Sequence, residues 1–331
     1  MARILVTGAS GFIGAHVARR LASDGHVVVA TGRDAARLGA LDGVVSELVA
    51  ADLADDALDG LLAGCDVVVH CAALSSPWGP AESFRKANVV ATERLLGASL
   101  RQRTRRFVHM GSPSIYFRFR DQFNVGEDFE PPRRWITEYA RSKWISECRV
   151  RDASNGQLQT PILRPRAVFG EGDRAILPRL LALASRGWFP LVDAGRALID
   201  VTHVDNLAAL VAHCVQADVT GSGRAYNVSN GTPIRVRALL GQLFDALGLQ
   251  PRLVPLPRLP ALALASLSER LARMRSACPE PRLTRYGVGV IAYSQTLDIS
   301  RATRELQYAP SMGIDAGLAR YARWWTTHDH A

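Results

Sequence analysis

The chain has 331 residues, of which 48% are hydrophobic and 21% charged, and its formal net charge is +9 with an isoelectric point near 9.8. This composition is that of a soluble globular protein with a sizeable core, built as one large α/β domain or two closely joined ones. The arginines are scattered and form no run of five or six basic residues, so the positive charge does not indicate nucleic-acid binding.

The cysteines and the N-terminal residues give no sign of secretion or of metal binding. Five cysteines lie far apart without CxxC spacing: Cys65, Cys71, Cys148, Cys214 and Cys278. They indicate neither a disulfide framework nor a zinc site. Glycines interrupt the apolar run of "MARILVTGASGFIG", unlike the core of a signal peptide, and no window reaches the 18 apolar residues of a membrane span. We therefore expect a cytoplasmic protein without a metal site or a transmembrane segment.

Short apolar runs bounded by turn residues recur along the first half of the chain. In order they are "RILVTG", "HVVVATG", "DVVVHCAAL", "RFVHMGS" and "TPILRP". The stretches between them have helical spacing, so they predict a doubly wound parallel sheet of the Rossmann type, covered by helices on both faces. After about Arg166 the alternation loosens, which predicts a first domain in residues 1–165 and a smaller lobe in residues 166–331. The stretch "AYNVSNG" (225–231) reads as a strand that can rejoin the main sheet.

A glycine motif follows the first predicted strand and opens a helix. The segment "TGASGFIG" has GxxGxxG spacing. Glycines allow a tight turn and close approach to a pyrophosphate, while the helix N-terminus supplies amide donors. Because the strand, motif and helix occur in the required order, we predict dinucleotide binding. The residues concerned are Gly8, Gly11, Phe12, Ile13 and Gly14.

The end of the second predicted strand bears on the choice between NADP(H) and NAD(H). It reads Thr31-Gly32-Arg33-Asp34, without an acid where the ribose hydroxyls of NAD are usually held. Arg33 can pair with a 2′-phosphate, which favours NADP(H). In the alternative, Arg33 is merely exposed and Asp34 or a backbone group holds the ribose.

Two later strand ends complete the predicted cofactor site. Asp52, with Leu53 beside it, follows the third strand and can accept a hydrogen bond from the adenine amino group. Ala72 and Ala73 end the next strand with small side chains that let the backbone approach the cofactor.

Taken in order, these motifs resemble those of the extended short-chain dehydrogenase/reductases. They are "TGASGFIG", "HCAAL", "SPSIY", "YARSK" and "LRPRAVFGEGD", and the resemblance runs from Arg3 to about Trp325. Within that family, "SSPWG", "SPSIYF", "ILPRLL", "YNVSNG" and "RWW" resemble the 3β-hydroxysteroid dehydrogenase-like branch, which includes the 2-alkyl-3-oxoalkanoate reductases of bacterial olefin biosynthesis. The resemblance implies cofactor contacts for Pro165 and Val168.

The resemblance also implies a catalytic set. Tyr139 and Lys143 of "YARSK" are four residues apart, which places them on one face of a helix. Tyr139 would be the general acid/base, Lys143 would support the phenol and hold the nicotinamide ribose, and Ser112 would donate a hydrogen bond to the substrate oxygen. The chain departs from the wider family at Phe117, where glycine is frequent, and at Gly111, where Ser or Thr is usual.

The substrate residues are less sharply defined by the sequence. We expect the substrate to meet a set that the resemblance suggests: Ser75, Trp78, Ser114, Phe117, Arg166 and Arg179. For Arg166 and Arg179, binding of a carboxylate, binding of a phosphate and no binding remain open. His70 and His203 are interpreted as structural or pocket-lining residues. The stripe formed by Leu264, Leu267, Leu271 and Met274 predicts an amphipathic helix, and packing on the body of the protein is favoured over a lid or weak contact with a membrane surface.

The resulting prediction is an NAD(P)-dependent oxidoreductase that interconverts a ketone and a secondary alcohol on a bulky apolar substrate, such as a 3-keto acid with alkyl chains or a 3-hydroxysteroid. One alternative is a nucleotide-sugar epimerase or dehydratase, and another is a dinucleotide-sensing regulator without catalysis. The family resemblance implies a homodimer.

Overall fold

The computed structural model describes residues 1–154, 156–216, 223–275, 279–281 and 283–328. Its strands are β1 (Arg3–Thr7), β2 (Val27–Gly32), β3 (Glu47–Ala50), β4 (Val67–His70), β5 (Arg106–Met110), β6 (Gln122–Val125), β7 (Ile162–Pro165), β8 (Val168–Phe169), β9 (Trp188–Val192), β10 (Leu198–Ile199), β11 (Thr202–His203), β12 (Ala225–Val228), β13 (Ile234–Arg235), β14 (Arg252–Leu256) and β15 (Gln295–Leu297).

The α-helices are α1 (Phe12–Ser23), α2 (Ala35–Leu38), α3 (Ala81–Phe84), α4 (Ala91–Arg101), α5 (Glu138–Asp152), α6 (Leu177–Ala184), α7 (Val204–Gln216), α8 (Val236–Ala246), α9 (Arg258–Arg273), α10 (Arg285–Ala292), α11 (Ser300–Leu306) and α12 (Ile314–His328). A π-helix, η2 (Arg85–Val90), joins α3 to α4, and short 3₁₀ turns are η1 (Gly39–Leu41), η3 (Pro113–Tyr116) and η4 (Asp193–Gly195).

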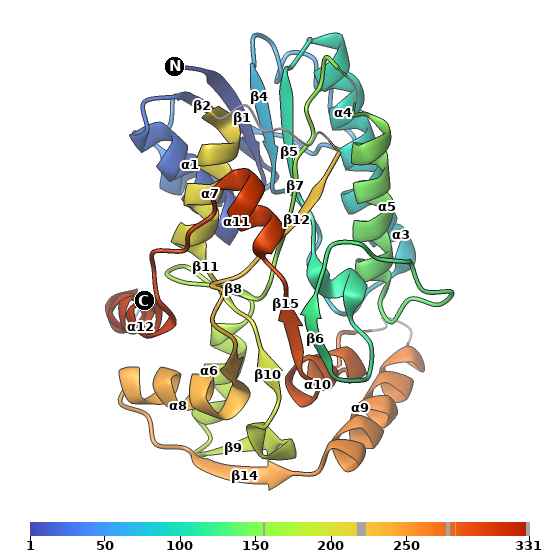
Figure 1. The fold of residues 1–331 in the computed structure, drawn as a ribbon, viewed down its shortest axis with the longest axis vertical. Coiled ribbons are helices and arrows are strands. Elements are labelled where there is room, and N and C mark those ends of the chain that lie inside the picture. Colours follow the sequence, from blue (N-terminus) through green and yellow to red (C-terminus); the bar gives the residue numbers. More distant parts are fainter. Residues whose placement is uncertain (155, 217–222, 276–278, 282, 329–331) are drawn as a thin grey trace.

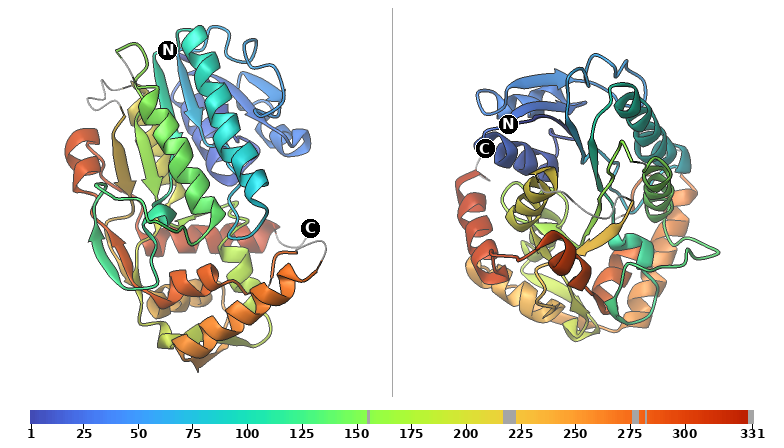
Figure 2. Two further views of the ribbon diagram at one scale, coloured as in Figure 1. Left: turned by 90° about the vertical axis from the view of Figure 1, so that its right-hand side faces the viewer. Right: turned by 45° about the horizontal axis from the view of Figure 1, so that its top comes forward.

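A seven-stranded parallel sheet forms the first layer of the fold, in the order β12-β7-β5-β4-β1-β2-β3 (Figure 1). Helices α1 and α7 cover one face and α4 and α5 the other (Figure 2). Strand β4 is buried along its whole length, as expected for a central strand covered on both sides. The predicted doubly wound fold is confirmed.

Helices α6, α8, α9 and α10 lie, with strands β6, β9, β10, β13, β14 and β15, in a second lobe below the carboxyl ends of the main strands (Figure 1). Its main sheet has the order β13-β10-β15-β6, and β9 pairs with β14 in a separate two-stranded ribbon. Two strands do not follow the predicted division of the chain. Strand β6 comes from the first half of the chain but pairs with β15 in the sheet of the second lobe, and β12 comes from the second half but pairs in parallel with β7 of the main sheet. The division into residues 1–165 and 166–331 therefore remains a proposal about folding units.

Helix α9 corrects one expectation. The stripe that was expected to pack on the body faces outward, since Leu264, Leu267 and Leu271 are each about half exposed. The helix packs instead through Ala261 and Ala265, which join a small cluster with α10. Alanines on this face allow closer packing than leucines would, and so the favoured sequence interpretation was wrong about which face is buried.

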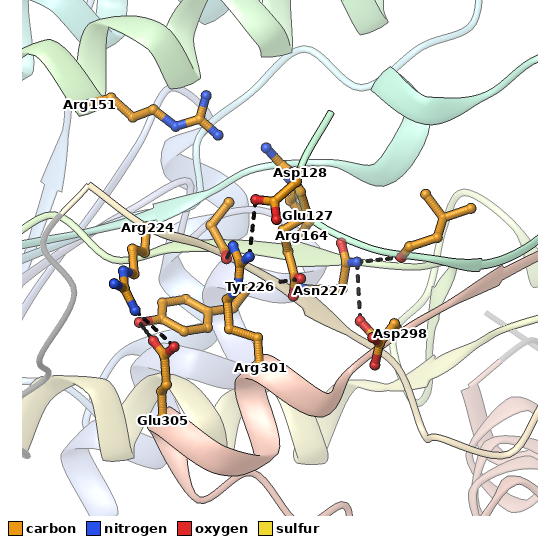
Figure 3. Close-up of polar contacts among 12 residues, drawn as sticks. Glu127, Asp128, Arg151, Arg164, Arg224, Tyr226, Asn227, Asp298, Arg301 and Glu305 are labelled. Carbon is orange, nitrogen blue, oxygen red and sulfur yellow. Dashed lines mark hydrogen bonds and ion pairs between the residues drawn. The ribbon is translucent and has the colours of Figure 1, made fainter. Parts of the chain in front are cut away.

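A buried ion pair ties α5 to the sheet. Arg164 of β7 and Glu147 of α5 are both fully buried, and the arginine Nε donates to Glu147 Oε2 at 3.0 Å. Arg164 also donates to the Tyr116 hydroxyl and to the Glu127 carbonyl oxygen. Figure 3 shows Arg164 behind Glu127, beside the polar contacts of Asn227 from β12. Because a buried charge without its partner is costly, each member of this pair depends on the other.

We expect Glu147→Gln to lower the free energy of unfolding by about 3–5 kcal/mol, because the substitution leaves the Arg164 charge buried and unpaired. The measurement is the urea midpoint at constant m-value. The matched control is Glu93→Gln, since Glu93 pairs with Arg149 at the surface. That substitution should cost about 1 kcal/mol or less, and equal losses in the two variants would contradict the prediction.

Candidate active site

The loop between β1 and α1 is packed as a dinucleotide cradle requires. Gly8 has a φ of +68°, and a Cβ at this position would lie 2.7 Å from the Ala72 nitrogen. A Cβ on Gly14 would lie 2.2 Å from the Gly8 carbonyl oxygen, so the first turn of α1 rests directly on the loop. Gly11 is the N-cap and supplies no side-chain cap. The first amides of α1 therefore remain available to an anion, and the residues fit a pyrophosphate.

The residues between these glycines have separate environments. Phe12 is partly exposed and meets His16 edge to face at 5.4 Å, whereas Ile13 packs against the core below α1.

At the end of β2, the structure leaves Arg33 free to meet a ligand. Its side chain is 67% exposed and lies 3.9 Å from Asp52 Oδ2. Asp34 is used locally, since its Oδ1 accepts from the Arg37 amide and caps α2. Ser10, which the sequence analysis did not identify, lies against Gly32, where an added Cβ would be 2.4 Å from its hydroxyl oxygen.

The other predicted cofactor residues border the same edge of the sheet. Asp52 Oδ1 accepts from the Ala54 amide, and Leu53 is a core residue whose carbonyl oxygen accepts from Arg94. The Ala72 amide donates to the Thr7 hydroxyl at 3.2 Å, and Ala73 is exposed.

Asn88, another residue that the sequence analysis missed, fixes the loop after β4. Its Oδ1 accepts from the Leu74 amide at 2.7 Å, and its Nδ2 donates to the Leu74 carbonyl oxygen and to the Ser142 hydroxyl of α5. Asn88 is buried in the π-helix η2. A single asparagine within "ANVVATERLL" is the only signal that the sequence offers.

Lys143 of α5 reaches the carboxyl end of β5, close in sequence to Ser112. The Lys143 ammonium donates to the Met110 carbonyl oxygen at 2.5 Å, two residues before Ser112. The Ser112 hydroxyl donates to the Ser114 hydroxyl at 2.9 Å and caps the turn η3. Tyr139 lies one helical turn before Lys143, is partly exposed, and has its ring 6.4 Å from that of Phe84.

The Lys143 ammonium is held in a dry environment. The side chain is only 3% exposed, and this burial lowers the pKa of Lys143 to about 8. Glu147 and Cys71 raise the pKa, but by less than burial lowers it. Two buried imidazoles lie nearby, at His70 and His109. Burial and the Lys143 charge lower the pKa of His70 to about 3 and that of His109 well below its usual value, so both remain neutral.

Arg166 and Tyr286 extend this site toward the second lobe. Arg166 is 8% exposed, and its Nε has no hydrogen-bond partner in the part of the chain that the structure describes. Burial raises the pKa of Tyr286 to about 12, while the nearby Arg166 charge lowers it and Tyr139 raises it. The charge of Asp200 acts on Arg166, but the hydrogen bond that Asp200 Oδ2 accepts comes from the Leu297 amide and not from the guanidinium.

Tyr286 lies on α10 and was not predicted. Its ring meets that of Phe117 at 5.3 Å, and a Cβ on Gly289 would lie 2.7 Å from the Phe117 ring. This close approach of α10 is what brings Tyr286 to the site. A glycine inside an apolar helix was the available sequence signal, but it does not identify its aromatic neighbour.

The other predicted substrate residues are not all together. Ser114 lies beside Ser112, Phe117 is packed in the aromatic cluster of α10, and Trp78 lies under the Arg273 guanidinium at 5.1 Å. Ser75 is exposed in the loop after β4. Arg179 is 61% exposed on α6 and pairs with Glu280 at 3.2 Å, outside the cluster of Arg166 and Tyr286.

Pro165 and Val168 lie on either side of Arg166, at the end of β7 and the start of β8, and both are partly buried.

His70 and His203 are both held by neighbouring polar groups. His70 hydrogen-bonds with the hydroxyls of Thr7 and Thr92, and His203 Nδ1 accepts from the Asp205 amide. His203, Glu171 and Asp205 could together surround a metal ion. However, the Arg320 guanidinium already donates to both carboxylates at 2.7 Å, so we assign no metal to this cluster.

Comparison with known proteins places this geometry in a family. The model of the NAD dependent epimerase/dehydratase family matches residues 4–229. The chain belongs to this family. It is 34% identical to a 2-alkyl-3-oxoalkanoate reductase of Stenotrophomonas maltophilia (96% of this chain and 98% of the relative are covered). It is 30% identical to a decarboxylating sterol-4-alpha-carboxylate 3-dehydrogenase of Candida albicans (80% and 77% covered).

A solved structure, MoeE5 in complex with UDP-glucose and NAD, matches 99% of this chain and 100% of its own with a TM-score of 0.79 and 25% identity. As a member of this epimerase/dehydratase family with reductase and dehydrogenase relatives, the protein is an NAD(P)-dependent oxidoreductase. Within the described residues, no helix is long and apolar enough to cross a membrane.

The buried Lys143 predicts a pH-dependent affinity for the dinucleotide. Below about pH 8 the ammonium is charged, and above it the charge is lost, so the attraction to an anionic cofactor weakens only as the pH rises. We expect the dissociation constant to rise by up to about tenfold per pH unit above this value. Tryptophan fluorescence titrations across the range measure it. In Lys143→Met the dependence should disappear, and a slope equal to that of the wild type would contradict the assignment.

Proposed function

We propose that the protein is an NADP(H)-dependent enzyme that interconverts a 3-oxo and a 3-hydroxy group on a bulky apolar acid. The observation that carries this proposal is Arg166, a buried guanidinium whose Nε lacks a hydrogen-bond partner among the described residues, close to Tyr286. A carboxylate is the natural partner for such a group, because charge-assisted hydrogen bonds offset the desolvation of both ions.

The names of two relatives support this substrate class. A 2-alkyl-3-oxoalkanoate and a sterol-4-carboxylate oxidised at carbon 3 both have a carboxyl group on the carbon next to the reacting one. A guanidinium near the catalytic phenol is suited to hold such a carboxylate. The partly exposed rings of Tyr286 and Trp78 offer apolar surface for the rest of the substrate.

Within this proposal, three residues perform the proton chemistry. When bound, the nicotinamide supplies or accepts the hydride. In the reductive direction, Tyr139 donates a proton to the carbonyl oxygen while the Ser112 hydroxyl hydrogen-bonds to that oxygen as negative charge develops. The Lys143 ammonium lies one turn from Tyr139 and favours its ionised form through its positive charge. Arg166 holds the carboxylate and so fixes which face of the carbonyl group is presented.

The preference for NADP(H) rests on the end of β2. Arg33 is exposed there, Asp34 is engaged in capping α2, and the Ser10 hydroxyl lies beside Gly32. A 2′-phosphate in this position gains the Arg33 guanidinium, which Asp52 Oδ2 approaches only to 3.9 Å.

A nucleotide-sugar epimerase is the second candidate, because the same Ser, Tyr and Lys serve that chemistry and a structural relative is complexed with UDP-glucose. Such an enzyme turns over without external dinucleotide. We further propose a cytoplasmic homodimer, in line with the family resemblance and with four free cysteines among the described residues; Cys278 lies outside them.

We expect Arg33→Ala to raise the KM for NADPH by about 10- to 150-fold and to leave that for NADH unchanged, because one charge-assisted contact contributes about 1.5–3 kcal/mol. Initial rates with each cofactor measure the effect. The matched control is Arg37→Ala, which removes a neighbouring exposed arginine paired with Asp34. Equal changes for both cofactors would show that Arg33 does not bind the phosphate.

Arg166→Gln tests the substrate class. With a 2-alkyl-3-hydroxy acid and NADP⁺, we expect the KM to rise by about 10- to 150-fold, whereas the methyl ester of the same acid should be turned over as by the wild type. Unchanged dinucleotide affinity shows that the variant is folded.

Two further variants serve as the negative and positive controls of this assay. Arg179→Gln should behave as the wild type, and Tyr139→Phe should lose about 10²–10⁴-fold in turnover with both compounds. Efficient turnover of a sugar nucleotide without added NADP⁺ would overturn the proposal in favour of the epimerase.

A further inference from the structure

Helix α9 presents an apolar stripe to solvent. Leu264, Leu267 and Leu271 are 53%, 54% and 53% exposed, and Met274, which caps the helix, is 82% exposed. Their spacing places them on one face of the helix. Leu259, in the first turn, is 76% exposed as well. Contiguous apolar surface of this kind is rare on soluble proteins and marks interaction sites.

The rotation of α9 about its axis is fixed, so the stripe cannot turn inward. On the opposite face, Ala261 and Ala265 are fully buried against a cluster that includes Val288 of α10. At the ends of the helix, the Arg258 guanidinium lies over the Tyr293 ring at 4.6 Å and that of Arg273 over Trp78 at 5.1 Å. Figures 1 and 2 show α9 at the outer edge of the lobe.

The charges beside the stripe are mainly positive. Arg270 and Arg275 are exposed next to it, and Arg258 and Arg273 lie toward the body. The one acid in this segment, Glu269, accepts from the Arg285 amide and has a side chain only 13% exposed. A partner for this surface must therefore offer apolar contacts and negative charge together.

We propose that α9 docks on the surface of a phospholipid membrane that contains anionic headgroups. Leucines on one face and arginines beside them are the pattern of a helix that lies in the membrane interface. A second copy of the chain fits less well, because a two-fold contact would bring two copies of this mainly positive surface together. A bilayer instead buries the leucines among acyl chains and pairs the arginines with lipid phosphates.

Helix α9 lies next to the elements that border the proposed substrate site. The helix packs on α10, which carries Tyr286, and its Arg273 covers Trp78 in the loop after β4. The docked face therefore adjoins the elements that border the proposed substrate site. An apolar substrate dissolved in the bilayer would reach this end of the protein first. The docking itself does not depend on the proposed reaction.

The experiment is flotation of the full-length protein with vesicles of phosphatidylcholine alone and of phosphatidylcholine with phosphatidylglycerol. We expect binding to the anionic vesicles that weakens at high salt. Leu267→Ser combined with Leu271→Ser should weaken it by about tenfold or more, because two half-exposed leucines no longer enter the bilayer. Arg270→Gln combined with Arg275→Gln should weaken it to a similar degree through the loss of two charges.

Matched controls separate this surface from general charge and hydrophobicity. Leu100→Ser changes an exposed leucine on α4, and Arg19→Gln with Arg304→Gln removes two exposed arginines, on α1 and α11. Both should bind vesicles as the wild type does. Failure of the wild type to float with anionic vesicles would overturn the proposal, as would equal losses in the controls. It would also be overturned if the leucine variant floats normally but sediments as a smaller oligomer, because α9 would then cover a second copy.

Discussion

The burial of the Lys143 ammonium against the Met110 carbonyl oxygen is the constraint on which the site depends. Lys143 belongs to a row of polar residues that follow one another at intervals of four along α5. The row consists of Tyr139, Lys143, Glu147 and Arg151. A helix normally buries its apolar stripe. Here the buried face of α5 is largely polar, and each of its charges is matched: Lys143 by a strand carbonyl and Glu147 by Arg164. The helix can lie in this position only if the sheet supplies those partners.

This polar row explains why sequence patterns identify some parts of the molecule and not others. Strands β1, β2, β4 and β5 are nearly continuous apolar runs, and glycines mark the loop before α1, so their places follow from general rules of α/β folds. The contacts of α5 do not, because its periodicity is polar. Tyr139 and Lys143 were predicted from their spacing and the family resemblance, whereas their buried partners depend on long-range packing. For the same reason Asn88 and Tyr286 escaped prediction, and the exposed stripe of α9 was assigned to the wrong face.

Arg164 and Arg166 show how partners, and not residue type, separate a structural arginine from one that we propose binds a ligand. They are two positions apart at the end of β7, and both are buried. Arg164 donates to Glu147, to the Tyr116 hydroxyl and to a backbone carbonyl group, so its guanidinium finds its hydrogen-bond partners within the fold. Arg166 leaves Nε without a hydrogen-bond partner among the described residues, and Asp200, whose charge acts on it, forms no hydrogen bond with it there. Retaining a guanidinium in that state costs stability, which is the expected property of a group kept for a ligand.

In the proposed function, the second lobe selects the substrate on which the catalytic residues act. The dinucleotide half supplies the glycine loop, Ser112 and α5, and these would serve a sugar nucleotide as well as a ketone. Helix α10 carries Tyr286 toward this site: Gly289 lets the helix approach Phe117 closely, and the Arg166 charge acts on the Tyr286 phenol. Helix α9 packs on α10 through small residues. The outward apolar stripe of α9 and the proposed substrate-facing residue Tyr286 of α10 therefore belong to one pair of packed helices. Under our two proposals, a change in the packing of that pair would alter both substrate selection and surface contact, while Ser112, Tyr139 and Lys143 stay in place.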